Sequence, residues 1–323
     1  MEYIDRYRWE MAEAFAEAAS EAERFPGELA RLGKELIAAC DPRKTGGKAS
    51  VIAFLLPYWM DDITGLGSRV CRDLAAGGIF AMLHYSIVDD LMDQPDAPPA
   101  EPRRLLTLGQ LFHAAFQARY ARHVKADPER LWALYSRYAA EWAAAVGGEP
   151  ERRADPLDIR QLARKSAPVK LGAAAMLMAA GMDERLPAVE QAVDLALAVL
   201  QLSDDWMDWA EDLAAPGGNA FLTIVREALN VGHAAGDGAE ARPLTERDVK
   251  AAIFRRGALA RLARIADDYA GRIDGRTAPP MLALFARTLA DGIRRGAEEA
   301  ERAAARLIAG NGFSRMLSEL SKY

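Results

Sequence analysis

The chain has 323 residues, 51% of them hydrophobic, which is enough for one large domain or two ordinary ones. Its formal charge of −6 at pH 7 argues against nonspecific nucleic-acid binding, and Cys40 and Cys71 are too few for a disulfide framework. No signal peptide opens the sequence, and no apolar run of about 20 residues lacks charge. We therefore expect a cytoplasmic protein without a transmembrane span.

Alanine, leucine, arginine and glutamate dominate the composition, whereas strand-like blocks are nearly absent. Helical patterns cover residues 4–24, a segment from the Pro26-Gly27 break to about residue 40, and then 66–93, 103–125, 128–146, 157–181, 185–213, 220–230, 245–272 and 280–309. The segments 41–48, 94–102, 147–156, 214–219 and 231–242 are predicted loops, the last of them mobile, and 312–323 is a short amphipathic tail. About eleven helices in one domain, 1–323, predict an all-α helical bundle with a central apolar cavity.

An acidic cluster ends the apolar run that begins near Leu186. In a helix, Asp204 and Asp208 lie four residues apart on one face, and Asp205 and Asp208 meet at a spacing of three. Asp212 extends that face by another turn. Because like charges at these spacings repel, a bound cation is expected to offset them. Mg²⁺ fits, since it takes carboxylate oxygens and keeps water or phosphate oxygens as its other ligands.

The same spacing occurs once more, where Asp89, Asp90 and Asp93 follow the apolar run 78–88. Both clusters close a hydrophobic helix, and the negative end of the helix dipole disfavours carboxylates there. A single such cluster is usually a solvated helix face, but two with the same spacing favour metal binding. Neither cluster has the alternating aspartates, central glycine and closing glutamate of an EF-hand loop.

Basic and aromatic residues near these clusters fit a substrate with a diphosphate head and a hydrocarbon tail. Lys48 lies in a glycine-containing loop before an apolar run, and Lys165 lies where another segment turns apolar. Each is either a phosphate ligand or an ordinary solvated cation. Phe80, Tyr85 and Trp206 are candidates to line a dry pocket around an allylic carbocation, or else plain core aromatics.

The two aspartate clusters resemble those of a class I isoprenoid synthase of the trans-isoprenyl diphosphate synthase (polyprenyl synthetase) type, over about residues 46–221. The DDLMD of 89–93 resembles the first aspartate-rich motif of that family, and the LQLSDDWMD of 200–208 resembles its second, FQxxDDxxD. Lys165-Ser166 resembles the Lys-Thr pair that precedes the second motif. The resemblance implies an isoprenoid synthase fold, three Mg²⁺ ions on the aspartates, diphosphate contacts from Lys165 and Gln201, and commonly a homodimer.

The sequence departs from chain-elongating members of that family at three places. Gly46-Gly47-Lys48 is present, but Val51 stands where an arginine usually completes the isopentenyl diphosphate motif. Arg103 and Arg104 follow the first motif late, after a proline-rich insertion. The Gly-Lys segment usually found after the second motif is replaced by 214–219. The half of the site that ionises an allylic diphosphate is therefore intact, and the half that binds a second diphosphate is eroded.

The resemblance also bears on the substrate and the reaction. His84 and Tyr85 stand five and four positions before the first aspartate pair, where bulky residues shorten the accepted tail, so we expect ten to fifteen carbons. The first hypothesis is a terpene synthase, a diphosphate lyase that ionises its substrate and then cyclises or eliminates. The alternatives are prenyl transfer to isopentenyl diphosphate or to a non-diphosphate acceptor, and a non-catalytic subunit of a heteromeric prenyltransferase.

Overall fold

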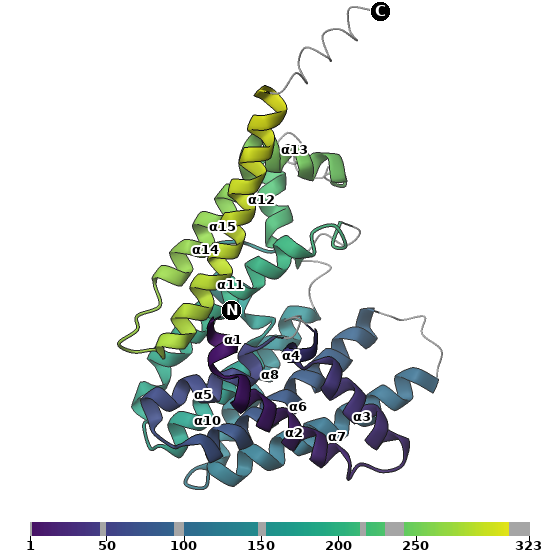
Figure 1. Ribbon diagram of the computed structural model, residues 1–323, viewed down its shortest axis with the longest axis vertical. Coiled ribbons are helices and arrows are strands. Elements are labelled where there is room, and N and C mark those ends of the chain that lie inside the picture. Colours follow the sequence, from purple (N-terminus) through teal and green to yellow (C-terminus); the bar gives the residue numbers. More distant parts are fainter. Residues whose placement is uncertain are drawn as a thin grey trace, which may run out of the picture. The chain divides into compact units, whose positions relative to one another are not determined.

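The computed structural model describes residues 2–45, 50–93, 100–147, 153–213, 218–229 and 242–309, and within these ranges it contains helices and no strand (Figure 1). The all-α prediction is confirmed. Two compact units are distinguished, and each is described separately below. Unit 1 comprises 1–140, 167–191 and 275–282, and unit 2 comprises 141–166, 192–274 and 283–323. The single domain and its central cavity remain predictions.

Unit 1 is built from the N-terminal helices and two later segments, 167–191 and 275–282. Its helices are α1 (Glu2–Arg6), α2 (Arg8–Ala22), α3 (Glu28–Ala39), α4 (Pro42–Thr45), α5 (Ile52–Thr64), α6 (Ser68–Asp93), α7 (Ala100–His123), most of α8 (Pro128–Val146), α10 (Lys170–Ala179), and the first turns of α11 (Leu186–Met207) and α15 (Pro280–Ala309). Unit 2 holds the remainder of α8, α11 and α15 together with α9 (Ile159–Arg164), α12 (Ala220–Ala228), α13 (Glu246–Arg256) and α14 (Ala258–Gly271).

Helix α6 is the centre of unit 1, where it packs against α7, α5 and α2. Two glycines allow the close approach. A Cβ atom on Gly78 would lie 2.1 Å from the Ala53 carbonyl oxygen of α5, and one on Gly77 would lie 2.8 Å from the Tyr120 ring of α7. Glycine inside a helix lowers helix stability, so a pair of glycines there needs a reason. In α6 that reason is the close packing against α5 and α7.

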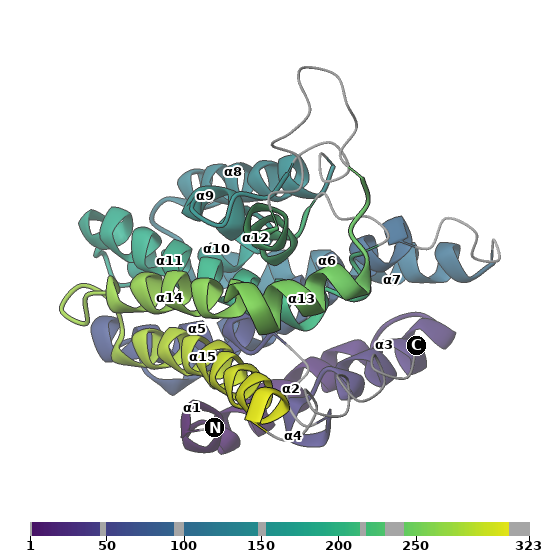
Figure 2. The same cartoon turned by 90° about the horizontal axis from the view of Figure 1, so that it is seen from above.

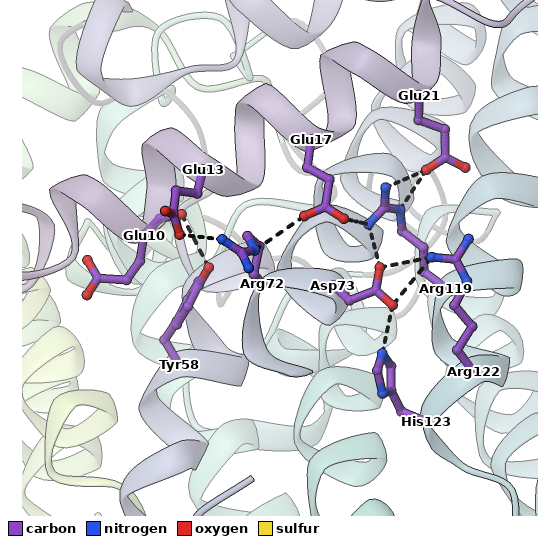
Figure 3. Close-up of polar contacts among 10 residues, drawn as sticks. All are labelled: Glu10, Glu13, Glu17, Glu21, Tyr58, Arg72, Asp73, Arg119, Arg122 and His123. Atoms are coloured by element: carbon purple, nitrogen blue, oxygen red, sulfur yellow. Dashed lines mark hydrogen bonds and ion pairs between the residues drawn. The ribbon is translucent and has the colours of Figure 1, made fainter. Parts of the chain in front are cut away.

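A polar network joins α2, α6 and α7 across this packed region (Figure 3). Asp73 of α6 accepts hydrogen bonds from Arg119, Arg122 and His123 of α7. The Arg119 guanidinium, which is almost fully buried, also contacts Glu17 and Glu21 of α2. The carboxylates on two helices thus surround a buried cation on a third, as expected for a charge that leaves water only when it is paired.

Helix α12 is the most enclosed helix of unit 2. Its first seven residues, 220–226, are all buried, and it packs against α13 and α14, the two consecutive helices seen together in Figure 2. The Asn219 side chain begins the helix by accepting a hydrogen bond from the Leu222 backbone N–H. At the other side, Gly257 adopts a left-handed φ of 67° that separates α13 from α14.

Four helix predictions and one loop prediction need correction. The segment 185–213 is helical only from Leu186 to Met207, so Asp208 and Asp212 lie after the end of α11, and the predicted loop 41–48 contains the short helix α4. The segment 157–181 is not one helix: α9 ends at Arg164, a short 3-10 turn follows, and α10 begins at Lys170. Pro168 explains the break, because it has no N–H to continue the helical ladder. The segment 245–272 divides at Gly257, whose positive φ ends a helix. The segment 4–24 divides at Tyr7 into α1 and α2.

Two helical segments, Ser68–Met92 and Asp183–Met207, are long and apolar enough to cross a membrane by length and composition alone. The structure buries 50% and 61% of their most apolar windows. The same pattern is expected of core helices in a helical bundle, so it is weak evidence for a membrane. The sequence-based expectation of no transmembrane span remains a prediction.

Candidate functional site

The second aspartate cluster lies at the end of α11 in unit 2, and its best-held member is Asp205. This residue is 3% exposed. Its Oδ1 accepts a hydrogen bond from Gln201 Nε2 at 2.7 Å, and its Oδ2 accepts one from the Ala220 backbone N–H at 2.7 Å. Both carboxylate oxygens are therefore engaged, one within α11 and one at the N-terminus of α12, where a negative charge is favoured.

Asn219, which was not predicted as a site residue, ties the cluster together. Its Nδ2 donates to the Asp205 carbonyl oxygen at 2.8 Å and to Asp212 Oδ2 at 2.7 Å, while its Oδ1 caps α12. A polar residue before the apolar segment 220–225 is the sequence signal that could have identified it. The side chains of Asp205 and Asp212 are consequently positioned by protein groups of unit 2.

Asp204 and Asp208, by contrast, are exposed to solvent. Loss of hydration around its carboxyl group, and then the Asp205 and Asp208 carboxylates, raise the pKa of Asp204 to about 7. Burial similarly raises the pKa of Asp205 to about 6. Because Asp204 is exposed, a cation can reach it, and the neighbouring carboxylates contribute to its raised pKa after the loss of hydration.

Lys165, one of the predicted site residues, lies beside this cluster. Its Nζ donates to the Gly218 carbonyl oxygen at 3.3 Å, one residue before Asn219. Its positive charge lowers the pKa of both Asp204 and Asp205, partly opposing the effect of burial. One lysine does not balance the carboxylates of this cluster, so the site can accommodate further positive charge.

These residues fit Mg²⁺ only if a phosphate-bearing substrate supplies some of its ligands. Among the side chains that the structure describes, no group of three or more His, Cys, Asp or Glu is placed to hold a metal ion. Asp204 and Asp208 nonetheless offer exposed carboxylates, and Mg²⁺ commonly binds through one or two carboxylates while phosphate and water complete its octahedron. The donor set therefore fits an ion that arrives with a phosphate-bearing substrate.

A buried arginine of unit 2 is a second residue that the sequence analysis missed. Arg226 of α12 is 8% exposed, and no carboxylate among the described residues pairs with it. Burial lowers the pKa of Arg226, and the nearby positive charge of Arg153 lowers it further. Two neighbouring cations of this kind can attract an anion. A basic residue within an otherwise apolar segment was the available sequence signal.

The first aspartate cluster closes α6 in unit 1. Asp89 and Asp90 are exposed there, and the side chain of Asp93 lies outside the described part of the chain. Burial, and then the negative charge of Asp90, raise the pKa of Cys40 at the end of α3. The exposed pair thus lies on solvent-accessible helix surface, near the position where α3 ends.

The predicted pocket residues occupy three different environments. Phe80 is fully buried, and its ring stacks on Phe112 with centroids 5.7 Å apart, as a core aromatic does. His84 and Tyr85 are half-buried and make polar contacts to α7 and α8. Trp206 of unit 2 is half-buried and meets Phe221 edge to face, with centroids 5.2 Å apart.

The remaining predicted diphosphate ligands are not gathered at either cluster by the contacts seen. Lys48 lies outside the described residues. Arg103 is exposed on α7, and only its backbone carbonyl has a described partner, the Thr107 hydroxyl. Arg104 lies 3.8 Å from Glu28 at the start of α3, with both side chains exposed. An exposed pair at this distance contributes little to stability.

Comparison with known proteins identifies no relative: no family model, no curated protein and no solved structure matches this chain. The site residues above therefore stand on sequence pattern and geometry.

Proposed function

We propose that this protein is a Mg²⁺-dependent terpene synthase that ionises an allylic isoprenyl diphosphate of ten to fifteen carbons and then cyclises or eliminates. The observation that carries the proposal is the acidic cluster of α11: Asp204 and Asp208 are exposed and crowded, while Asp205 is locked in place beside Lys165. Crowded carboxylates with a single nearby lysine suit a site that is completed by metal ions and a diphosphate.

The residues have separate roles in this proposal. Asp204 and Asp208 of unit 2 would hold a metal ion, which would offset the charge that develops on the departing diphosphate. The family resemblance gives Asp89 and Asp90 of unit 1 the same metal-binding role. Lys165 contacts the diphosphate and stays fixed by the Gly218 carbonyl. Asp205 keeps the N-terminus of α12 in place and thereby positions Lys165 and its neighbours.

Val51 favours this reaction over chain elongation. It stands where an arginine would bind isopentenyl diphosphate, and in the structure its side chain is 5% exposed in the core of unit 1. An arginine at that position would have to bury its charge, which costs several kcal/mol unless it is paired. The chain is therefore adapted to an apolar residue at this position, in keeping with a lost site for the second diphosphate.

The test is incubation of the purified protein and Mg²⁺ with geranyl, farnesyl or geranylgeranyl diphosphate, each with and without isopentenyl diphosphate. Released diphosphate and the organic extract are both analysed. A hydrocarbon or alcohol formed without isopentenyl diphosphate is the expected result. A longer diphosphate formed only in its presence would establish prenyl transfer instead, and no turnover under any condition would contradict the proposal.

A matched pair of variants locates the chemistry. Asp204→Asn should lower diphosphate release by about 100-fold or more, because a neutral amide is a poor ligand for Mg²⁺ and stabilises no cation. Asp268→Asn changes an equally exposed aspartate on α14, whose partner is Arg272 one turn away, and should leave the rate unchanged. Equal rates in the two variants would remove Asp204 from the site.

A further inference from the structure

Behind the first aspartate cluster, a chain of hydrogen bonds runs through three helices of unit 1. The Tyr85 hydroxyl of α6 lies 3.0 Å from the Tyr135 hydroxyl of α8. The Tyr135 hydroxyl in turn lies 2.7 Å from His113 Nε2 of α7. Tyr135 is 9% exposed, so this chain is largely sheltered from water.

The protonation state of the His113 imidazole indicates which group donates in each hydrogen bond. Burial lowers the pKa of His113, so its ring is neutral near pH 7. A separation of 2.7 Å is short for an N–H donor, which prefers about 2.9–3.0 Å, and usual for an O–H donor. With His113 Nε2 as the acceptor, Tyr135 donates to His113, and Tyr85 can donate to Tyr135. The chain ends in a basic nitrogen.

A second imidazole holds the first in position. The His84 ring stacks on His113 with centroids 4.6 Å apart and an interplanar angle of 24°. His84 Nδ1 lies 3.0 Å from the Gly109 carbonyl oxygen, and since a carbonyl only accepts, this nitrogen carries the proton. Burial, followed by the neighbouring His113, lowers the pKa of His84, so the stack is neutral at rest.

The chain begins next to the aspartates. Tyr85 precedes Asp89 by four residues on α6, so the two side chains share a face and are separated by one turn, about 6 Å along the axis. A substrate whose diphosphate is bound at Asp89 and Asp90 would extend its hydrocarbon tail along this face. Phenylalanine would pack equally well at positions 85 and 135, so an apolar wall does not explain two hydroxyls and a basic nitrogen arranged in series.

We propose that Tyr85, Tyr135 and His113 form a relay that removes the proton from the carbocation and so ends the reaction in an alkene. The inference rests on the proposed function. A C–H bond next to the cationic carbon breaks, and its electron pair becomes the new π bond. The proton passes to the Tyr85 oxygen as Tyr85 passes its own proton to Tyr135, and Tyr135 passes its proton to His113 Nε2. The positive charge leaves the carbocation and rests on an imidazolium, which later returns its proton to water.

The roles of the members differ. In this relay Tyr85 is the catalytic residue, because its oxygen would accept the proton directly from the carbocation. Tyr135 and His113 act through Tyr85, and His84 positions His113 by stacking. General acid–base groups in such roles typically contribute about 10² to 10⁴ in rate. Because the cation has already formed when these residues act, their removal is expected to change the product ratio and not the rate of diphosphate release.

The experiment uses the full-length protein, Mg²⁺ and the allylic diphosphate that the wild type turns over, with diphosphate release and the alkene-to-alcohol ratio measured together. Tyr135→Phe keeps the ring and removes one link, and His113→Asn keeps a hydrogen-bond acceptor but removes the base. Each should leave diphosphate release within about threefold, and should lower the alkene-to-alcohol ratio by about tenfold or more as water captures the cation.

The control is Tyr120→Phe, which removes a buried hydroxyl from α7 at a residue that does not belong to the relay. It should preserve both the rate and the product ratio. Diphosphate release with an unchanged product ratio in Tyr135→Phe, His113→Asn and Tyr85→Phe would overturn the relay alone. Absence of diphosphate release from the wild-type protein would overturn the proposed function, and the relay with it.

Discussion

The buried cation of unit 1 offers a sharp test of how this fold is held together, by replacing Arg119 with methionine (Figure 3). The Arg119 side chain is 4% exposed, and it contacts Asp73 at 2.5 Å and Glu21 Oε2 at 2.5 Å. Methionine retains most of the packing volume and removes the charge. The change therefore isolates the electrostatic and hydrogen-bonding contribution of this residue.

The expected cost follows from what the carboxylates keep. Asp73 retains Arg122 at 3.1 Å and His123 at 2.7 Å, whereas Glu21, with its side chain 20% exposed, loses its described partner on α7. Breaking a buried ion pair usually costs about 3–5 kcal/mol. Because part of the charge stays compensated, we expect about 3 kcal/mol, the lower end of that range.

Arg72→Met is the control for this prediction. Arg72 contacts Glu13 at 2.7 Å and Glu17 at 3.5 Å, but the three side chains are 32%, 59% and 39% exposed. Exposed pairs of this kind contribute about 1 kcal/mol or less. Urea denaturation monitored by circular dichroism gives both free energies of unfolding from the midpoint and slope. An Arg119→Met protein no less stable than Arg72→Met would refute the reasoning.

Three further changes test other parts of the structure, each by urea denaturation. Asp205→Asn should cost about 1–3 kcal/mol, because its amide faces two donors where the carboxylate accepted both; an unchanged midpoint would mean that the contact to α12 is dispensable. Gly78→Ala should cost about 3 kcal/mol by forcing α5 and α6 apart, whereas Gly292→Ala, with open space around its Cβ position, should stabilise α15 by about 0.5–1 kcal/mol; equal effects would contradict the close approach. Burial lowers the pKa of His113 from its ordinary 6.5, so the folded protein binds fewer protons than the unfolded chain and loses stability as the pH falls below about 6.5. His113→Asn should therefore flatten the plot of unfolding free energy against pH in this range. An equally steep loss in the variant would count against the assignment.

The sequence predicted the helical class because apolar residues recur at a spacing of three and four over most of its length. The boundaries failed where a single residue acts on the backbone. The break between α9 and α10 depends on Pro168, which lies inside a segment predicted as one helix. The break between α13 and α14 depends on Gly257, and a glycine in a helical pattern signals either a tolerated residue or an end.

The candidate site was predictable to the extent that its residues share one helix. The spacing predicts Asp204 and Asp208 on one helix face, but α11 ends at Met207, so Asp204 lies in its last turn and Asp208 directly after it, both exposed. The contribution of Asn219 depends on the loop that returns α12 to Asp205, and the link from Tyr135 to His113 depends on α7 and α8 packing in register. Tertiary contacts of this kind leave no periodic signal in the sequence.

The second aspartate motif illustrates why spacing alone does not assign roles. Adjacent residues on a helix point about 100° apart, so Asp204 and Asp205 cannot serve the same partner. The structure turns Asp205 toward the first turn of α12, where backbone N–H groups lack helical partners and the Ala220 N–H donates to the Asp205 carboxylate. Asp204 is left at the surface with a raised pKa, so it has the least compensated charge of the pair. A cation bound there would be stabilised by the Asp204 carboxylate, which has no structural role of the kind that Asp205 has. Removal of Asp205 would instead loosen α12, the helix that carries Arg226.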